Sequence, residues 1–209
     1  MERRLRLLEW ARESGAWIVE DDYDSEFRFG GRPLEPLQGL DTTGRVIYLG
    51  SFSKVMLPTL RLGFAVLPTP LVAAFGKAKY LSDWHTGVPV QGAAAEFIDD
   101  GLLGTHIRRM QRAYGRRHDR ILEILDRDLG RWLEPVPAHG GLHVTARLRR
   151  AEAEQDVEVA RRARDQGVEI FPLSYHFRDQ PPEAGLLFGY GAITTEDIEE
   201  GLDLLSRCF

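Results

Sequence analysis

One lysine stands among hydroxyl and guanidinium groups directly after an apolar run. Residues 46–49 read as a buried strand; Ser51, Ser53 and Lys54 lie in the turn that follows, and Arg61 comes seven residues later. Ligands bind at strand ends in α/β sheets. A lysine amine forms a Schiff base with an aldehyde, and serine hydroxyls with an arginine fork bind phosphate. The set predicts a site for a phosphorylated aldehyde, while this segment alone is equally compatible with a solvent-exposed lysine in a strand-to-strand loop.

A second apolar strand ends in acidic and aromatic residues. Residues 17–20 lead into Asp21 and Tyr23. A pyridoxal ring needs a carboxylate against its pyridine nitrogen to act as an electron sink, and a phenol near its ring hydroxyl tunes the reactive imine. Asp21 and Tyr23 can supply both groups. We interpret the other acids of the turn as helix caps or solvated loop residues: Asp22, Asp24 and Glu26.

These segments carry a resemblance to a known family. The runs Glu20–Arg28, Ser51–Lys54 and Arg61–Phe64 resemble the fold-type I aminotransferase-like module of MocR/GabR-type regulators, bacterial proteins of the GntR family with a winged-helix DNA-binding domain. The likeness continues through Gly140–Val144 and Ile193–Gly201. It implies that the chain corresponds to the carboxy-terminal part of that class I/II aminotransferase-like domain.

The resemblance also implies a cofactor and its contacts. The cofactor is pyridoxal 5'-phosphate, and Lys54 is the lysine that binds it covalently and acts in catalysis. Asp21 then faces the pyridine nitrogen, and Tyr23 lies near the ring hydroxyl. The implied phosphate contacts are Ser51 and Arg61, with Ser53 as an additional candidate.

The expected fold class is α/β: a partial fold-type I large domain of three αβα layers, followed by a small α+β domain. We expect residues 1–85 to be the carboxy-terminal part of the cofactor-binding large domain, 86–130 a long connecting helical region and 131–209 the small domain. Apolar periodicity and caps predict the elements. Helices are expected at 1–14, 70–82, 90–129 with interruptions near Gly101 and Gly104, 154–166, and 195–207 with Thr195 at its start; strands are expected at 17–20, 46–49, 62–67, 132–136, 142–148, 168–171 and 186–190.

Two departures from the family matter for function. Its regulators are more than twice this long, and the winged helix and the first half of the aminotransferase domain precede the point where this chain begins. Related aminotransferases bind the substrate carboxylate with an arginine on the late strand, where this sequence has Leu187. Leucine cannot form that ion pair. Arg178 is the nearby alternative, although a solvated loop arginine is the more ordinary interpretation.

Composition limits the function classes. The formal charge of the 209 residues is -5, which argues against general nucleic-acid affinity, since duplex binding depends on basic residues. Arginines gather between 108 and 120, which we interpret as a solvated helix face for interdomain or subunit contacts.

Cys208 is the only cysteine, and the six histidines lack metal-ligand spacing, so we expect no metal site. No apolar run reaches the length of a membrane span, and a cytoplasmic location is expected.

We therefore expect a pyridoxal-phosphate-dependent aminotransferase-like domain that either transaminates an amine or amino acid or senses it through an external aldimine. The full-length form is expected to be a homodimer, and this chain is expected to make no direct contact with DNA or membrane. The alternative is a non-catalytic fragment of a transcription regulator that binds no cofactor alone. A generic α/β ligand-binding module is a third class, disfavoured by the joint presence of Lys54, Asp21, Tyr23 and Arg61.

Overall fold

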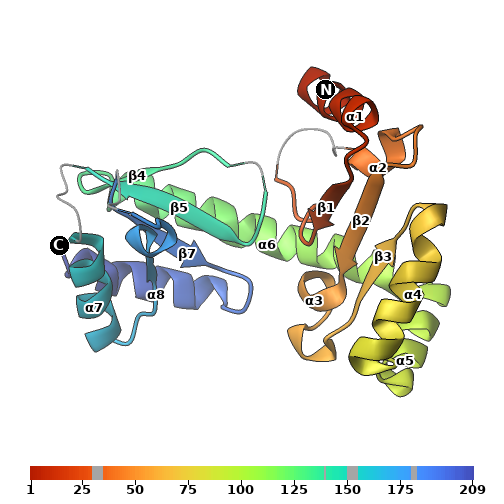
Figure 1. Cartoon of the computed structure of the whole chain (residues 1–209). Helices are drawn as coiled ribbons and strands as arrows, with labels where there is room; N and C mark the ends of the chain where they lie inside the picture. Colours follow the sequence, from red (N-terminus) through yellow and green to blue (C-terminus); the bar gives the residue numbers. More distant parts are fainter. Residues whose placement is uncertain (30–34, 139, 150–154, 180–182) are drawn as a thin grey trace. The chain divides into compact units, whose positions relative to one another are not determined.

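The structure, a computed structural model, describes residues 1–29, 35–138, 140–149, 155–179 and 183–209. The chain divides into two compact units (Figure 1). The amino-terminal unit comprises Met1–Glu26 and Gly31–Arg108, and the carboxy-terminal unit comprises Phe27–Gly30 and Arg109–Phe209. The two compact units do not test the three-part division expected from the sequence, which stays a prediction.

The amino-terminal unit is built on a three-stranded sheet of order β1-β2-β3. β1 runs parallel to β2, and β3 runs antiparallel to β2. The apolar residues Val46 and Ile47 at the start of β2 are buried and belong to the core of this unit. The elements of this unit are α1 (Glu2–Ser14), β1 (Ile18–Asp22), α2 (Leu37–Leu40), β2 (Val46–Ser51), α3 (Phe52–Val55), the 3-10 turn η1 (Pro58–Leu60), β3 (Gly63–Val66), α4 (Thr69–Asp83) and α5 (Val88–Asp99).

The carboxy-terminal unit has a four-stranded antiparallel sheet of order β4-β5-β7-β6. Its core lies between this sheet and the helices beside it, with Leu125, Leu186 and Leu205 fully buried (Figure 1). Phe27 is also fully buried, and its ring meets Tyr114 edge to face at 4.9 Å. The elements are the greater part of α6 (Leu102–Arg127), β4 (Leu133–Pro135), β5 (His143–Leu148), α7 (Gln155–Asp165), β6 (Phe171–Pro172), the 3-10 turn η2 (Leu173–His176), β7 (Gly185–Gly189) and α8 (Thr195–Ser206).

Most expected elements are confirmed, and three are corrected. The helix break falls at Gly101, where φ is +71° and suits only glycine well, whereas Gly104 lies inside α6. The strand expected at 168–171 pairs only from Phe171, and Gly167 before it has φ of +84°. Helix α8 is capped by Thr194 rather than Thr195. The expected start of α7 at Glu154 lies outside the described residues.

Candidate functional site

The two neighbouring carboxylates of β1 lie on opposite faces of the first sheet. Asp21 pairs with Leu49 and Asp22 with Gly50, and successive strand residues point to opposite faces. Since Ser51 follows Leu49 by two residues in β2, Asp21 and Ser51 belong to the same face. The strand register thus places the proposed ring carboxylate and a proposed phosphate contact on one side of the sheet.

Asp22 is held on the other face by its own neighbours. The Tyr48 hydroxyl donates to Asp22 Oδ2 at 2.9 Å, and the Ser25 hydroxyl donates to the same oxygen at 2.9 Å. The Ser25 N–H donates to Asp22 Oδ1 at 3.3 Å. Burial raises the pKa of the Tyr48 phenol well above its ordinary value, and the hydrogen bond to Asp22 raises it further. These bonds give Asp22 a local structural role at the end of β1, so the interpretation of it as a helix cap or solvated loop residue is corrected.

Asp21, by contrast, is exposed and unengaged. Among the described residues, its carboxylate makes no hydrogen bond or ion pair within the chain. Tyr23 lies just beyond the end of β1, with 49% of its surface exposed. Both side chains are therefore accessible to a ligand.

The turn after β2 presents the hydroxyl groups and the lysine. Ser51 is the N-cap of α3, and its Oγ accepts the Ser53 N–H at 3.1 Å. This bond uses the oxygen as an acceptor, so the Ser51 O–H proton remains free to donate. Lys54 lies in the last turn of α3 and is exposed, and its amine has no partner among the residues that the structure describes.

Arg61 is carried back to the same edge of the sheet by the short turn η1. The Phe52 N–H donates to the Leu62 carbonyl at 3.0 Å, and Ser51 pairs with Gly63 across the strands. Arg61 itself is exposed and has φ of +49° and ψ of +39°, a left-handed conformation that is uncommon for a residue with a side chain. Its backbone is held by an N–H bond to the Pro58 carbonyl at 3.4 Å.

The backbones of β2 and β3 approach each other closely at this edge, a feature that we did not predict. A Cβ on Gly63 would lie 2.9 Å from the Gly50 carbonyl oxygen, and a Cβ on Gly50 would lie 2.3 Å from the Phe64 ring. Only glycine fits both positions as they stand. The partner of Asp22, Tyr48, was also missed. The strict alternation of side chains along β1 and β2 is the signal that could have found it.

The substrate-carboxylate candidates belong to the other unit. Leu187 lies inside β7, paired with Thr145 and with Phe171. Arg178 is exposed in the loop after η2. The second sheet is therefore continuous at Leu187.

The described part of the chain contains neither a candidate metal site nor a candidate membrane-spanning helix. No group of three or more His, Cys, Asp or Glu side chains there could hold a metal ion. Within the same residues, no helix is both long and apolar enough to cross a membrane.

The chain is similar to known regulators and enzymes. No family model matches the chain. The probable rhizopine catabolism regulatory protein MocR of Rhizobium meliloti is 42% identical over 209 residues, which are 100% of this chain and 42% of that protein. The chain is homologous to the carboxy-terminal part of the MocR-type regulators. It spans less than half of the length of this regulator.

The chain also matches solved aminotransferases. A kynurenine aminotransferase of Pyrococcus horikoshii, solved in complex with PMP, is 29% identical with a TM-score of 0.87 over 100% of this chain and 51% of the enzyme. LysN, the α-aminoadipate aminotransferase of Thermus thermophilus, was solved with N-(5'-phosphopyridoxyl)-L-leucine; it is 32% identical, with a TM-score of 0.86 over 98% of this chain and 53% of LysN. The chain therefore has about half of the fold-type I aminotransferase fold, as the sequence predicted.

Proposed function

We propose that this chain is the carboxy-terminal part of a pyridoxal-phosphate-dependent, aminotransferase-like domain in which Lys54 binds the cofactor. The observation that carries the proposal is the separation of Asp21 from Asp22. One carboxylate is free on the sheet face that also bears Ser51, and the other is engaged by Tyr48 on the opposite face. Relatives solved with pyridoxal-derived groups support the same cofactor.

The donor set fits such a cofactor. When bound, pyridoxal phosphate supplies an aldehyde that condenses with amines and a pyridine ring that accepts electrons. Asp21 would hold a proton on the pyridine nitrogen, and Tyr23 would approach the ring hydroxyl. Ser51 would donate its free O–H to a phosphate oxygen while its lone pair continues to cap α3. Arg61 would pair with the phosphate as a fork, with Ser53 as a further contact.

Lys54 would carry out the proton chemistry. The Lys54 amine would hold the cofactor, and when it is free the same Lys54 amine would be the base that takes a proton from the substrate carbon. Lys54 is exposed on a short helix that Ser51 caps, which leaves the amine free to move between these two positions. Asp21 would favour the proton transfer by keeping the ring cationic.

The ligand that we propose is a small amine or amino acid, bound either for transamination or for sensing. The regulator MocR among the relatives supports sensing, and the enzymes among them support turnover. Leu187 disfavours recognition of an α-carboxylate by this strand, because it offers no positive charge. We further propose a homodimer for the longer protein and a cytoplasmic location, with DNA contacts made by parts other than this chain.

Borohydride trapping tests the role of Lys54. Pyridoxal phosphate is added to the chain and to a version extended to the length of its relatives; the mixture is reduced with borohydride, and the peptides are read by mass spectrometry. We expect an absorbance band near the visible edge and a single labelled peptide that contains Lys54. Lys54→Ala should abolish both signals, whereas Lys77→Ala, a change of an exposed lysine on α4, should abolish neither. Labelling at Lys77 or Lys79 with Lys54 untouched would contradict the assignment.

The alternative function, a fragment that binds no cofactor alone, has its own supporting observation. Among the described residues, 18 of the 20 exposed large apolar side chains lie in the amino-terminal unit, which also carries the proposed cofactor residues. The same trapping experiment separates the two ideas. Labelling of Lys54 in the extended version but not in the 209-residue chain would support the alternative for this chain and keep the role of Lys54.

A further inference from the structure

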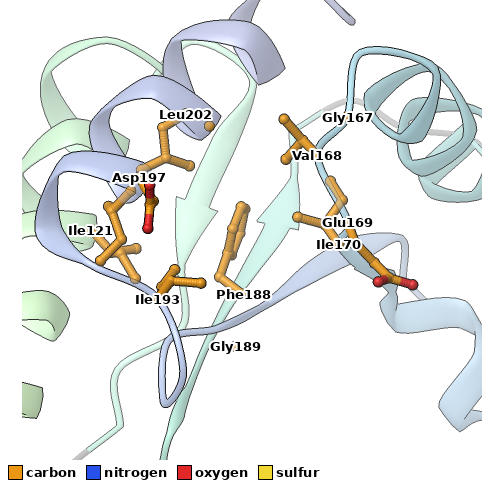
Figure 2. A pocket seen from close by; sticks show the side chains of 12 residues that line it. Ile121, Gly167, Val168, Glu169, Ile170, Phe188, Gly189, Ile193, Asp197 and Leu202 are labelled. Atoms are coloured by element: carbon orange, nitrogen blue, oxygen red, sulfur yellow. The ribbon is translucent and has the colours of Figure 1, made fainter.

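The carboxy-terminal unit contains an open cavity of about 220 Å³ that the proposed function does not use. Its floor is made of core side chains from three elements: Ile121 of α6, Phe188 of β7 and Leu202 of α8, all buried (Figure 2). Ile193 and Val168 also line it. An apolar cavity of about 150 Å³ holds a benzene ring. This cavity is therefore large enough for a phenyl ring or a short alkyl chain.

The charged side chains of the lining are both acidic. Asp197 lies on α8 beside the apolar residues, and Glu169 lies at the rim with its carboxylate directed outward (Figure 2). Asp197 Oδ2 accepts the Thr194 N–H at 3.0 Å, and the hydrogen bonds with Thr194 lower the pKa of Asp197, so it is ionised at neutral pH. No lysine or arginine lines the cavity within the described residues. A ligand with a positive end is therefore favoured over a neutral or an acidic one.

Gly201 leaves room on the helical wall. It lies in the middle of α8, where a Cβ would meet only Val168 Cγ1 at 3.9 Å, an ordinary contact. Alanine would fit there and would favour the helix by about 1 kcal/mol. The absence of a side chain at Gly201 thus keeps the cavity open at a cost to helix stability.

We propose that this cavity binds a small primary amine with a phenyl or short alkyl group. The apolar group is buried against Phe188 and Ile121, and the ammonium lies at the mouth beside Asp197. All of these residues belong to the carboxy-terminal unit, whereas Lys54 and Asp21 belong to the other unit. An amine would thus bind this protein in two places: at the proposed cofactor in the amino-terminal unit, and in this cavity.

Protein-observed NMR on the cofactor-free 209-residue chain tests the proposal. The probe is 2-phenylethylamine, and 2-phenylethanol is the neutral control of the same shape. We expect saturable shifts centred on the amides of Val168, Ile193 and Gly201, with a dissociation constant on the order of 1 mM for a ligand of this size. The alcohol should bind about threefold more weakly, since an exposed ion pair contributes little. Equal binding of alcohol and amine would overturn the assignment of a cationic ligand.

Three variants locate the binding. Gly201→Leu places a side chain in the cavity on a helix that accepts leucine, and should weaken binding at least tenfold. Asp197→Asn keeps an oxygen for the Thr194 N–H but removes the charge, and should abolish the preference for the amine. Glu200→Gln, a change of an exposed acid on α8 outside the lining, should leave binding unchanged. Saturable binding that Gly201→Leu does not weaken, or no saturable shifts in the wild-type chain, would overturn the proposal. Because the measurement omits pyridoxal phosphate, its failure would not affect the role of Lys54.

Discussion

At the scale of single residues, hydrogen bonding separates acids that look alike in the sequence. Asp21 and Asp22 are adjacent, yet Asp22 accepts bonds from Tyr48 and Ser25, while the carboxylate of Asp21 is free. Asp156 differs from both, because its side chain is fully buried and accepts three hydrogen bonds. The function of a carboxylate in this chain thus depends on which donors surround it.

Exchange of each β1 carboxylate for its amide should give two different results. In a version extended to the length of the relatives, Asp21→Asn should keep cofactor affinity within about tenfold but slow proton exchange at the substrate carbon by about 10²–10³-fold, because the ring nitrogen loses its ionic partner. Asp22→Asn should affect exchange much less. It should instead bring the pKa of the Tyr48 phenol down toward its ordinary value, measured by ultraviolet titration with Tyr48→Phe as the blank. Equal exchange rates in the two variants would mean that Asp21 does not contact the ring.

Asp156 provides a stability prediction. Its Oδ2 accepts the Ser174 N–H at 2.9 Å and the Gly185 N–H at 3.1 Å, and its Oδ1 accepts the Ser174 hydroxyl at 2.8 Å. Asp156→Ala leaves these buried donors unpaired and should lower the free energy of unfolding by about 3–5 kcal/mol. Asp156→Asn can still accept both N–H groups through its oxygen, so it should cost only about 1–2 kcal/mol. Urea unfolding followed by circular dichroism measures both, and equal losses would show that charge matters more than the bonds.

At the scale of elements, the ends of helices and strands follow local chemistry more closely than apolar periodicity does. Gly15 closes α1 in a left-handed conformation directly after the helix end predicted at residue 14, whereas the cap of α8 was predicted one residue too late. Thr194 has extended backbone angles, its side chain accepts the Asp197 N–H at 3.1 Å, and the Asp197 carboxylate accepts the Thr194 N–H. This reciprocal pair is a capping box.

The capping box can be tested with two neighbouring threonines. Thr194→Ala should lower the free energy of unfolding of the carboxy-terminal unit by about 1 kcal/mol, since it removes a side-chain cap. Thr195→Ala should cost clearly less. The folded-state pKa of Asp197 is lowered by its bonds to Thr194, so its contribution is complete above the ordinary carboxyl pKa and is lost as pH falls through the lowered value. The Thr194 backbone N–H that bonds to the Asp197 carboxylate is kept in Thr194→Ala, so both proteins should lose stability at acidic pH. Thermal melts should show a difference between wild type and Thr194→Ala that persists at acidic pH or becomes slightly smaller, because the lost bond from the Asp197 N–H to Thr194 Oγ does not titrate. A difference that grows at acidic pH would contradict this account.

At the scale of the whole molecule, the two units differ in how much apolar surface they bury. Of the 27 buried apolar residues in the described part of the chain, 22 lie in the carboxy-terminal unit. Helix α4 has no buried residue, and Leu81 on it is 81% exposed. Hydrophobic burial is the main favourable contribution to folding, so the amino-terminal unit has a much weaker source of stability.

Hydrogen exchange should reveal this difference. In the 209-residue chain, we expect amides of α4 and β3 to exchange at least about tenfold faster than those of β5, β7 and α8, because few apolar contacts oppose local opening. Mass spectrometry of deuterium uptake by peptide measures it. In a version extended to the length of the relatives, protection of α4 and β3 should rise while that of β7 stays the same. Uniform protection of both units in the 209-residue chain would mean that the exposed apolar surface does not weaken the amino-terminal unit.

The sequence by itself determined most of the elements and the prediction of where the site lies. The order of apolar strand, hydroxyl turn, Lys54 and Arg61 is a local pattern, and local patterns are written directly in residue types and spacing. The tertiary structure decided what depends on pairing between distant segments. Only the register of β1 on β2 puts Asp21 on the face of Ser51 and Asp22 against Tyr48. The cavity beside Gly201 likewise depends on how α6, β7 and α8 pack together, because a void arises from the fit of side chains that periodicity alone cannot specify.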